Sequence, residues 1–143
     1  MIFVMVGNPY KESVQMLNPR KELGAKGEKL AAKFLKRKGY KIIQCNYKCK
    51  LGEIDIIARH DETFVFTEVK TRRTLEFGPP QYAITAAKRK QISKVALSYI
   101  REKRLNGQSC RFDVIAITFS PESRKPEIEH IQNAFQLSRK YTY

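Results

Sequence analysis

The sequence is poor in the residues that build zinc sites, with three cysteines and two histidines. Cys45 and Cys49 form one C-x3-C pair, no second ligand pair follows it, and the histidines are not at zinc-finger spacing. This pattern excludes the common zinc-finger arrangements. The cysteines therefore indicate unpaired structural thiols in a reducing cytoplasm.

Long apolar runs and glycine-rich nucleotide loops are also missing. No apolar run approaches the roughly 20 residues that a membrane-spanning helix needs. No P-loop or dinucleotide-binding fingerprint is present. His60 falls at an expected turn and His130 lies near the end of the chain, so neither indicates a histidine-based nuclease.

Acidic residues are scarce relative to basic ones. The 143 residues include 28 Lys and Arg but 14 Asp and Glu, a formal net charge of +14. A chain of this length fits one domain with a sizeable core. The positive excess favours a polyanionic partner, with general solubility as the simpler explanation. Nucleic acid and an anionic membrane surface both suit such a charge, and of the two we expect nucleic acid.

The hydrophobic patterns predict one α/β domain over residues 18–143, with residues 1–17 as a loosely attached extension. We expect a helix, three strands, a second helix, a fourth strand and a short edge strand: 18–38, 40–47, 52–59, 63–70, 81–103, 110–119 and 127–131. The first three strands are expected to form an antiparallel meander. The crossover helix then places the fourth strand parallel to the third. The prediction is a mixed central sheet flanked by helices.

The stretch from residue 52 to residue 70, GEIDIIARHDETFVFTEVK, has the pattern of a hairpin with its turn at residues 61–62. In that register Asp55 lies directly opposite Glu68, on one face of the sheet. Opposed side chains have Cβ atoms about 5 Å apart, where two carboxylates repel by roughly 3 kcal/mol at an effective dielectric near 20. Fold stability does not require this pair. A divalent cation such as Mg²⁺ relieves the repulsion.

Glu53 and Lys70 form the next opposed pair on the same face. A simpler interpretation is that Lys70 pairs with Glu53 or Glu68 at a solvated end of the sheet. A loop of odd length would also move Asp55 out of this register. The other face carries aliphatic side chains: Ile54, Ile56, Val65 and Val69. The hairpin is therefore apolar on both faces except for one charged island.

Both helices carry polar residues on or beside their apolar stripes. Glu28 lies at the stripe of the first helix, and Lys88 and Gln91 lie within that of the second. Lys88 and Gln91 would reach the charged island or a phosphate. The alternative is a snorkelling lysine beside a hydrogen-bonded glutamine. Asp113 is polar within an apolar strand, and we predict a structural hydrogen bond for it.

The spacing of three charged residues resembles a known active-site motif. Asp55, Glu68 and Lys70 form a D-x(12)-E-x-K pattern, which looks like the motif of the PD-(D/E)-x-K nuclease superfamily. Ile54 stands where the superfamily's name puts proline.

Longer segments make the resemblance more specific. GEKLA at residues 27–31, GEIDIIA at 52–58 and EVKTR at 68–72 resemble the YraN-like uncharacterised bacterial family within that superfamily. The resemblance extends over residues 18–119 and implies a restriction-endonuclease-like fold.

The resemblance also implies roles for individual residues. Asp55 and Glu68 would bind Mg²⁺ or Mn²⁺, with the Val69 carbonyl as a further ligand. Lys70 would orient or stabilise the attacking water, and Glu28 would complete the site. Phosphodiester hydrolysis needs a metal that lowers the pKa of water and neutralises developing charge, which this set of residues could supply.

We therefore expect a Mg²⁺-dependent nuclease that acts on DNA, including branched or structured substrates, in the cytoplasm. Lys88, Gln91 and Arg72 are the candidates for contacts with the nucleic acid. A non-catalytic nucleic-acid-binding module with the same fold is the alternative. A homodimer stays open as the state of assembly.

Overall fold

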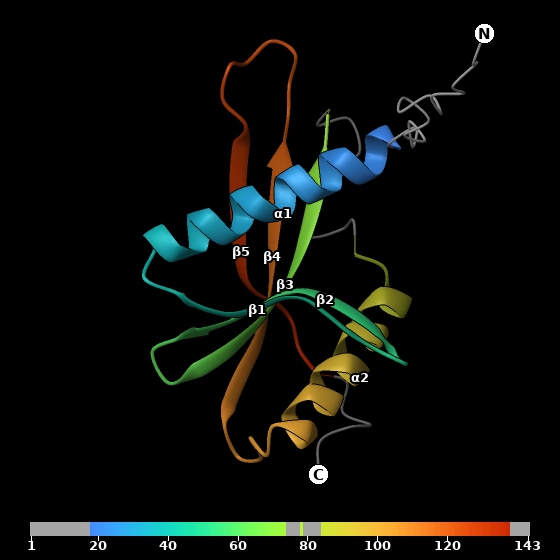
Figure 1. Cartoon of the computed structure of the whole chain (residues 1–143), viewed down its shortest axis with the longest axis vertical. Helices are drawn as coiled ribbons and strands as arrows, with labels where there is room; N and C mark the ends of the chain where they lie inside the picture. Colours follow the sequence, from blue (N-terminus) through green and yellow to red (C-terminus); the bar gives the residue numbers. More distant parts are fainter. Residues whose placement is uncertain (1–17, 74–77, 79–83, 138–143) are drawn as a thin grey trace, which may run out of the picture.

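The computed structural model describes residues 18–73, 78 and 84–137 (Figure 1). The expected extension, residues 1–17, lies outside this part. So do the prolines of the predicted chain break at residues 79–80 and the first residues of the predicted second helix, 81–83.

The described elements follow the predicted order, with differences at their ends. They are α1 (Pro19–Arg37), β1 (Lys41–Cys49), β2 (Gly52–His60), β3 (Thr63–Arg72), α2 (Ala86–Glu102), β4 (Ser109–Thr118) and β5 (Glu127–Phe135). The prediction that Ile84 is helical was wrong. Thr85 is the N-cap of α2, and its side chain accepts a hydrogen bond from the Lys88 N–H. The expected short edge strand is longer than predicted and pairs along β4.

The strands form one mixed sheet in the order β1-β2-β3-β4-β5. The first three strands are an antiparallel meander, β4 is parallel to β3, and β5 is antiparallel to β4. This arrangement confirms the predicted α/β class with its antiparallel and parallel parts. The parallel step places the ends of β3 and β4 at the same edge of the sheet.

The two helices cover different faces of this sheet (Figure 1). Ala31 and Leu35 of α1 pack with alternate residues of β2 and β3, such as Ile56 and Val65. The intervening residues, such as Phe66, pack against α2. None of the described helices combines the length and hydrophobicity needed to cross a membrane.

The hairpin of β2 and β3 has the predicted register. Pairs run from Ile56 opposite Thr67 to His60 opposite Thr63, so the turn holds two residues, of which Asp61 has a positive φ of 52°. The pairing of β2 with β3 stops at Ile56. Asp55, the residue before Ile56 in β2, therefore lies where the ladder ends.

The face predicted for Ile54 was wrong, because this side chain packs with Ile57 in the cluster under α2. The backbone is irregular at this point. Asn46, between the residues paired with Ile54 and Ile56, has a left-handed φ of 53°. The regular alternation of faces is consequently lost around Asp55, where side chains from both helical layers approach the sheet.

Candidate functional site

Asp55 is held at the open end of the β2–β3 ladder. Its carboxyl oxygen Oδ2 accepts a hydrogen bond of 2.8 Å from the main-chain N–H of Val69. The side chain thus replaces a backbone acceptor, and the hydrogen bond fixes its direction. Glu68 precedes Val69, so its carboxyl group lies next to that of Asp55, and the two interact. Both residues are buried, with 8% and 6% of their surface exposed.

Two lysines from different elements flank Glu68. The Nζ atoms of Lys70, on β3, and Lys88, on α2, each lie 3.7 Å from the same oxygen, Oε1. Lys88 therefore reaches the carboxyl pair from the start of the second helix. Glu53 is not part of this group: it pairs instead with Lys48 at 3.9 Å on the surface. Glu53 and Lys70 are thus not paired with each other: Glu53 contacts Lys48, and Lys70 contacts Glu68.

Burial raises the pKa of both carboxyl groups, and the charge of Asp55 adds to the rise at Glu68. Burial, followed by the charge of Asp55, raises the pKa of Glu68 to about 7, although Lys88 and Lys70 oppose the shift. Burial also raises the pKa of Asp55, while the Val69 N–H counteracts it. The hydrogen bond between the two groups favours a protonated Glu68 and an ionised Asp55. Glu68 is therefore the member of the pair that keeps its proton up to near neutral pH.

Glu28 approaches the pair from α1. Gly27 allows α1 to lie close to Thr71 of β3, because a Cβ at this position would collide with the threonine hydroxyl. Burial and the charge of Asp55 raise the pKa of Glu28, and a hydrogen bond with the Asn46 side chain lowers it. The third predicted carboxyl group is therefore close enough to Asp55 to interact with it electrostatically.

The other nucleic-acid candidates have defined contacts. Gln91 donates a hydrogen bond of 3.4 Å to the Leu51 carbonyl. Its side chain also packs against Gly52 so closely that a Cβ atom at this glycine would collide with it. Gln91 thus supports the β1–β2 turn, in line with the alternative stated for it. Arg72 donates to the Gly78 carbonyl at 2.7 Å and to Thr118 Oγ1 at 3.4 Å.

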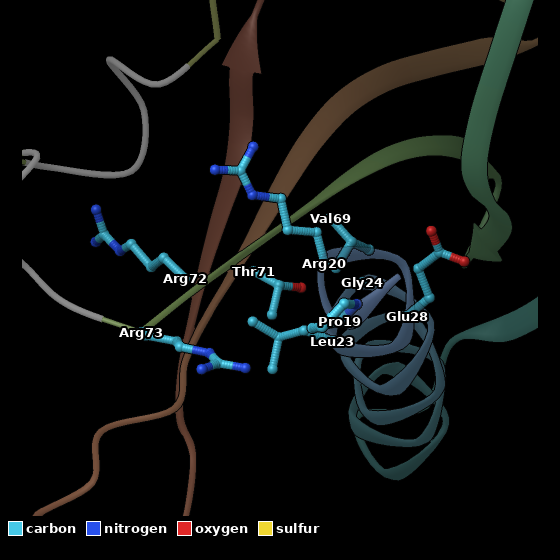
Figure 2. Close-up of a pocket in the computed structure, with 9 residues that line it drawn as sticks. All are labelled: Pro19, Arg20, Leu23, Gly24, Glu28, Val69, Thr71, Arg72 and Arg73. Atoms are coloured by element: carbon cyan, nitrogen blue, oxygen red, sulfur yellow. The ribbon is translucent and has the colours of Figure 1, made fainter. Parts of the chain in front are cut away.

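A basic hollow adjoins the carboxyl pair between the start of α1 and the end of β3 (Figure 2). Its cavity volume is about 580 Å³. We call it the arginine pocket, and its residues include Arg20, Leu23, Gly24, Glu28, Arg72 and Arg73. In Figure 2 the guanidinium groups lie on one side and the Glu28 carboxyl points the other way. Val69 also lines the pocket. Because the Val69 N–H donates a hydrogen bond to Asp55, this residue lies between the pocket and the carboxyl pair.

The donor set fits a hard divalent cation. Such ions take carboxylate oxygens, a few waters and substrate phosphate as ligands, and Asp55 keeps one carboxyl oxygen beyond its bond to Val69. Within the described residues there is no group of three or more acidic, histidine or cysteine side chains assembled tightly enough to hold a metal. Glu28 is therefore near the pair without closing a three-carboxylate cage.

Three residues of this region were missed from the sequence. Asn46 contacts Glu28, and a left-handed asparagine is a recognised backbone exception, but nothing in YKIIQCNY marks it. Arg20 and Arg73 line the arginine pocket. They carried no signal among 28 basic residues, since only the packing of α1 on β3 brings them together.

The fold and the carboxyl pair define a small α/β protein with a buried, lysine-flanked acidic site at the end of a hairpin. The chain belongs to the uncharacterised protein family UPF0102, whose model matches residues 27–117. That segment contains every carboxyl and lysine residue of the site.

Relatives of the same family match most of the chain. A UPF0102 protein of Geobacter metallireducens is 52% identical over 118 residues, which cover 82% of this chain and 95% of the relative. One from Geobacter sulfurreducens is 53% identical over 119 residues, covering 82% and 91%. One from Pelotomaculum thermopropionicum is 42% identical over 120 residues, covering 84% and 100%.

Proposed function

We propose that this protein is a Mg²⁺-dependent nuclease of the PD-(D/E)-x-K superfamily that hydrolyses phosphodiester bonds in DNA. The sheet order and the carboxyl pair at the end of β2 and β3 are compatible with a restriction-endonuclease-like fold. Mn²⁺ is a substitute for Mg²⁺ in this proposal. The three free cysteines, Cys45, Cys49 and Cys110, fit a reducing cytoplasm as the place of action.

One observation carries the proposal: two carboxyl groups, Asp55 and Glu68, are buried next to each other, and the pKa of each is raised, chiefly by burial. Buried like charges destabilise a fold, so their presence needs another reason. Strongly shifted, mutually coupled groups gather at functional sites. Near neutral pH Glu68 loses its proton readily, as binding of a cation would require, because its pKa is about 7.

The residues of the site divide the work of phosphodiester hydrolysis. Asp55 and Glu68, with the Val69 carbonyl, would hold the cation, which supplies an activated water and neutralises charge on the phosphate. Lys70 places a positive charge beside the attacking oxygen, where a water-poor site makes it effective. Lys88 lies equally close to Glu68 and is a second cation for the phosphate. Glu28 adds negative charge on the α1 side.

The basic surface supplies the affinity for DNA. The net charge of +14 attracts the phosphate backbone, and cations at the site hold one strand of it. Branched and structured DNA are the proposed substrates.

A non-catalytic nucleic-acid-binding module is the second candidate, and one observation favours it. Glu68 already has two lysine partners at 3.7 Å, so the charges of Asp55 and Glu68 are balanced without a metal. In that case the lysines neutralise the pair, and the site contributes to binding alone.

Cleavage of a DNA panel separates the two candidates. Wild-type protein, Lys70→Ala and Glu68→Ala are incubated with single-stranded, duplex, flapped and four-way DNA in excess Mg²⁺ or Mn²⁺. We expect wild type to cleave at least one substrate. Both variants should lose cleavage by at least about a hundredfold while they keep most of their DNA affinity, because the lost contacts act on the transition state.

The outcomes against the nuclease are specific. If all three proteins bind alike and none cleaves, the binding module replaces the nuclease. Cleavage by Lys70→Ala at the wild-type rate would indicate a contaminating enzyme or a different site. Lys94→Ala is the matched control, because this lysine is exposed on α2, the helix that carries Lys88, and its loss should not affect cleavage.

A further inference from the structure

The arginine pocket has a local excess of positive charge. Arg20 and Arg73 make no side-chain hydrogen bond or ion pair within the described part of the chain. Arg72 is held by neutral oxygens of Gly78 and Thr118. Among the residues of the lining that the structure describes, Glu28 is the only acidic one, and its carboxyl group points away from the arginines toward the sheet (Figure 2). An anion is therefore the chemical complement of this hollow.

The guanidinium groups, rather than the start of α1, provide the donors. The Arg20 N–H is already bonded to Asn18 Oδ1 at 3.1 Å. The N–H groups of Lys21 and Glu22 are bonded to the Asn18 carbonyl at 2.9 and 3.1 Å. Main-chain donors of the first turn are thus in use. Arginine forks match the oxygens of a phosphate group and bind it through two parallel hydrogen bonds.

Apart from Thr71, the rest of the described lining is apolar, which is unusual for a site that takes a bare anion. Pro19, Leu23 and Val69 form much of it, and nothing lies within 4 Å of a Cβ built on Gly24. The cavity volume of about 580 Å³ falls in the range of small-molecule sites. An apolar wall beside phosphate donors is the complement of a nucleotide, with its flat base, sugar and phosphate.

We propose that the arginine pocket receives one nucleotide of an unpaired nucleic-acid strand, next to the phosphate that lies at Asp55 and Glu68. Its phosphate contacts Arg20 and Arg73, and its sugar and base lie against Leu23. The strand must be unpaired because a base in a duplex stays in the stack and cannot enter a hollow. This inference rests on the proposed function, and it restricts the substrate to DNA with a single-stranded segment at the site.

A filled pocket tests the inference in a protein that should fold. Gly24→Leu adds a side chain in open space of α1, and Gly24→Ala is the matched control. Both replace a glycine within a helix by a better helix former, so they differ mainly in the volume they occupy. Affinity is measured by fluorescence anisotropy in EDTA, with an oligothymidylate and a duplex of the same length. We expect Gly24→Leu to bind the single strand at least about tenfold more weakly, the effect of one lost base contact. Gly24→Ala, and duplex binding by both variants, should match wild type.

A second pair of variants tests the phosphate contacts. Arg20→Gln with Arg73→Gln removes two pocket arginines. Arg37→Gln with Arg101→Gln removes two exposed arginines at the ends of α1 and α2. The slope of log affinity against log salt should fall by about 0.7 for the first double variant on single strands, because both arginines contact one phosphate. The control double variant should keep the wild-type slope.

Several results overturn the inference. The nucleotide does not bind in the pocket if Gly24→Leu binds single strands with the affinity of wild type. The same conclusion follows if this variant loses as much affinity for the duplex as for the single strand. Equal slope changes in both arginine double variants would mean general attraction alone. Binding of inorganic phosphate is tested separately by thermal shift. The pocket would be a site for a free anion if phosphate stabilised wild type more than the Arg20/Arg73 double variant and Gly24→Leu left strand binding unchanged. If wild type binds but none of these variants differs, only this inference fails. If wild type binds no nucleic acid, the proposed function fails as well.

Discussion

Two aspartates are buried in the same sheet, and their surroundings are opposite. Asp113 on β4 has no exposed surface. Its carboxyl group accepts hydrogen bonds from Arg111 Nε at 3.0 Å and the Asn133 N–H at 2.9 Å, and His130 Nε2 lies 2.8 Å from it. These partners lower its pKa despite burial. Asp55 has one main-chain donor and a second carboxyl group beside it, and its pKa is raised.

We interpret the difference as that between a structural charge, Asp113, and a charge for which we propose a function, Asp55. At Asp113 the fold provides a partner for each carboxyl oxygen, as buried charges require. This confirms the structural hydrogen bond predicted for that residue. Asp55 and Glu68 are instead two buried acids next to each other, an arrangement that lowers the free energy of unfolding. We infer that stability was optimised at the first position and limited by function at the second.

The largest expected effect on stability comes from removing Asp113, the buried aspartate whose carboxyl oxygens all have hydrogen-bond partners. Asp113→Ala removes the acceptor from Arg111, His130 and the Asn133 N–H and leaves them buried without it. We expect the free energy of unfolding to fall by about 3–5 kcal/mol. Urea denaturation at neutral pH measures it. A loss below about 1 kcal/mol would show that the network contributes no more than an average hydrogen bond.

The next effect should have the opposite sign and should depend on pH. The folded-state pKa of Glu68 is raised from 4.5 to about 7, so the folded protein binds more protons than the unfolded chain in this range. The stability of wild type therefore falls as pH rises from about 4.5 through 7. Glu68→Gln cannot ionise. Its stability relative to wild type should increase between pH 5 and pH 8 by roughly 3 kcal/mol at most.

Urea denaturation at several pH values, with a chelator present, measures this difference. Glu62→Gln is the control, because Glu62 is exposed and pairs with Arg59 on the surface. A stability difference between Glu68→Gln and wild type that stays constant from pH 5 to pH 8 would contradict the raised pKa of Glu68.

The smallest expected effect comes from Glu53, an exposed acid on the strand of Asp55 whose charge makes only a minor contribution to the raised pKa of Asp55. Glu53 pairs with Lys48 at 3.9 Å, and both side chains are exposed. Glu53→Gln should change the free energy of unfolding by less than about 1 kcal/mol. It should not alter DNA cleavage either. A large effect on either would extend the functional group of acids beyond Asp55 and Glu68, and thermal denaturation with the cleavage panel would detect it.

The sequence predicted the elements that depend on periodicity and on local signals. Asn18 and Pro19 mark the start of α1, and its side-chain cap is present. The turn at Asp61 sets the hairpin register from which the neighbourhood of Asp55 and Glu68 followed. Alternation and register are properties of short segments, so a single sequence contains them.

The remaining features depend on contacts between distant segments. Ile54 changes face because Asn46, on another strand, adopts a left-handed conformation. The start of α2 was missed because Ile84 fits the helical spacing although the cap is Thr85. Lys88 was recognised as misplaced on an apolar stripe, but its contact with Glu68 depends on how α2 packs. Such details follow from tertiary packing, which local patterns do not contain.

A Mg²⁺ titration by calorimetry tests the central claim, that Asp55 and Glu68 form a metal site, most directly. It is performed at pH 6.5 in two buffers of different ionisation enthalpy, with wild type and Asp55→Asn. Because the pKa of Glu68 is about 7, most of this residue is protonated at that pH, and a bound cation must displace the proton. The account predicts binding to wild type with release of up to about one proton, and loss of both signals in Asp55→Asn. Equal binding by the two proteins, or binding without proton release, would contradict it.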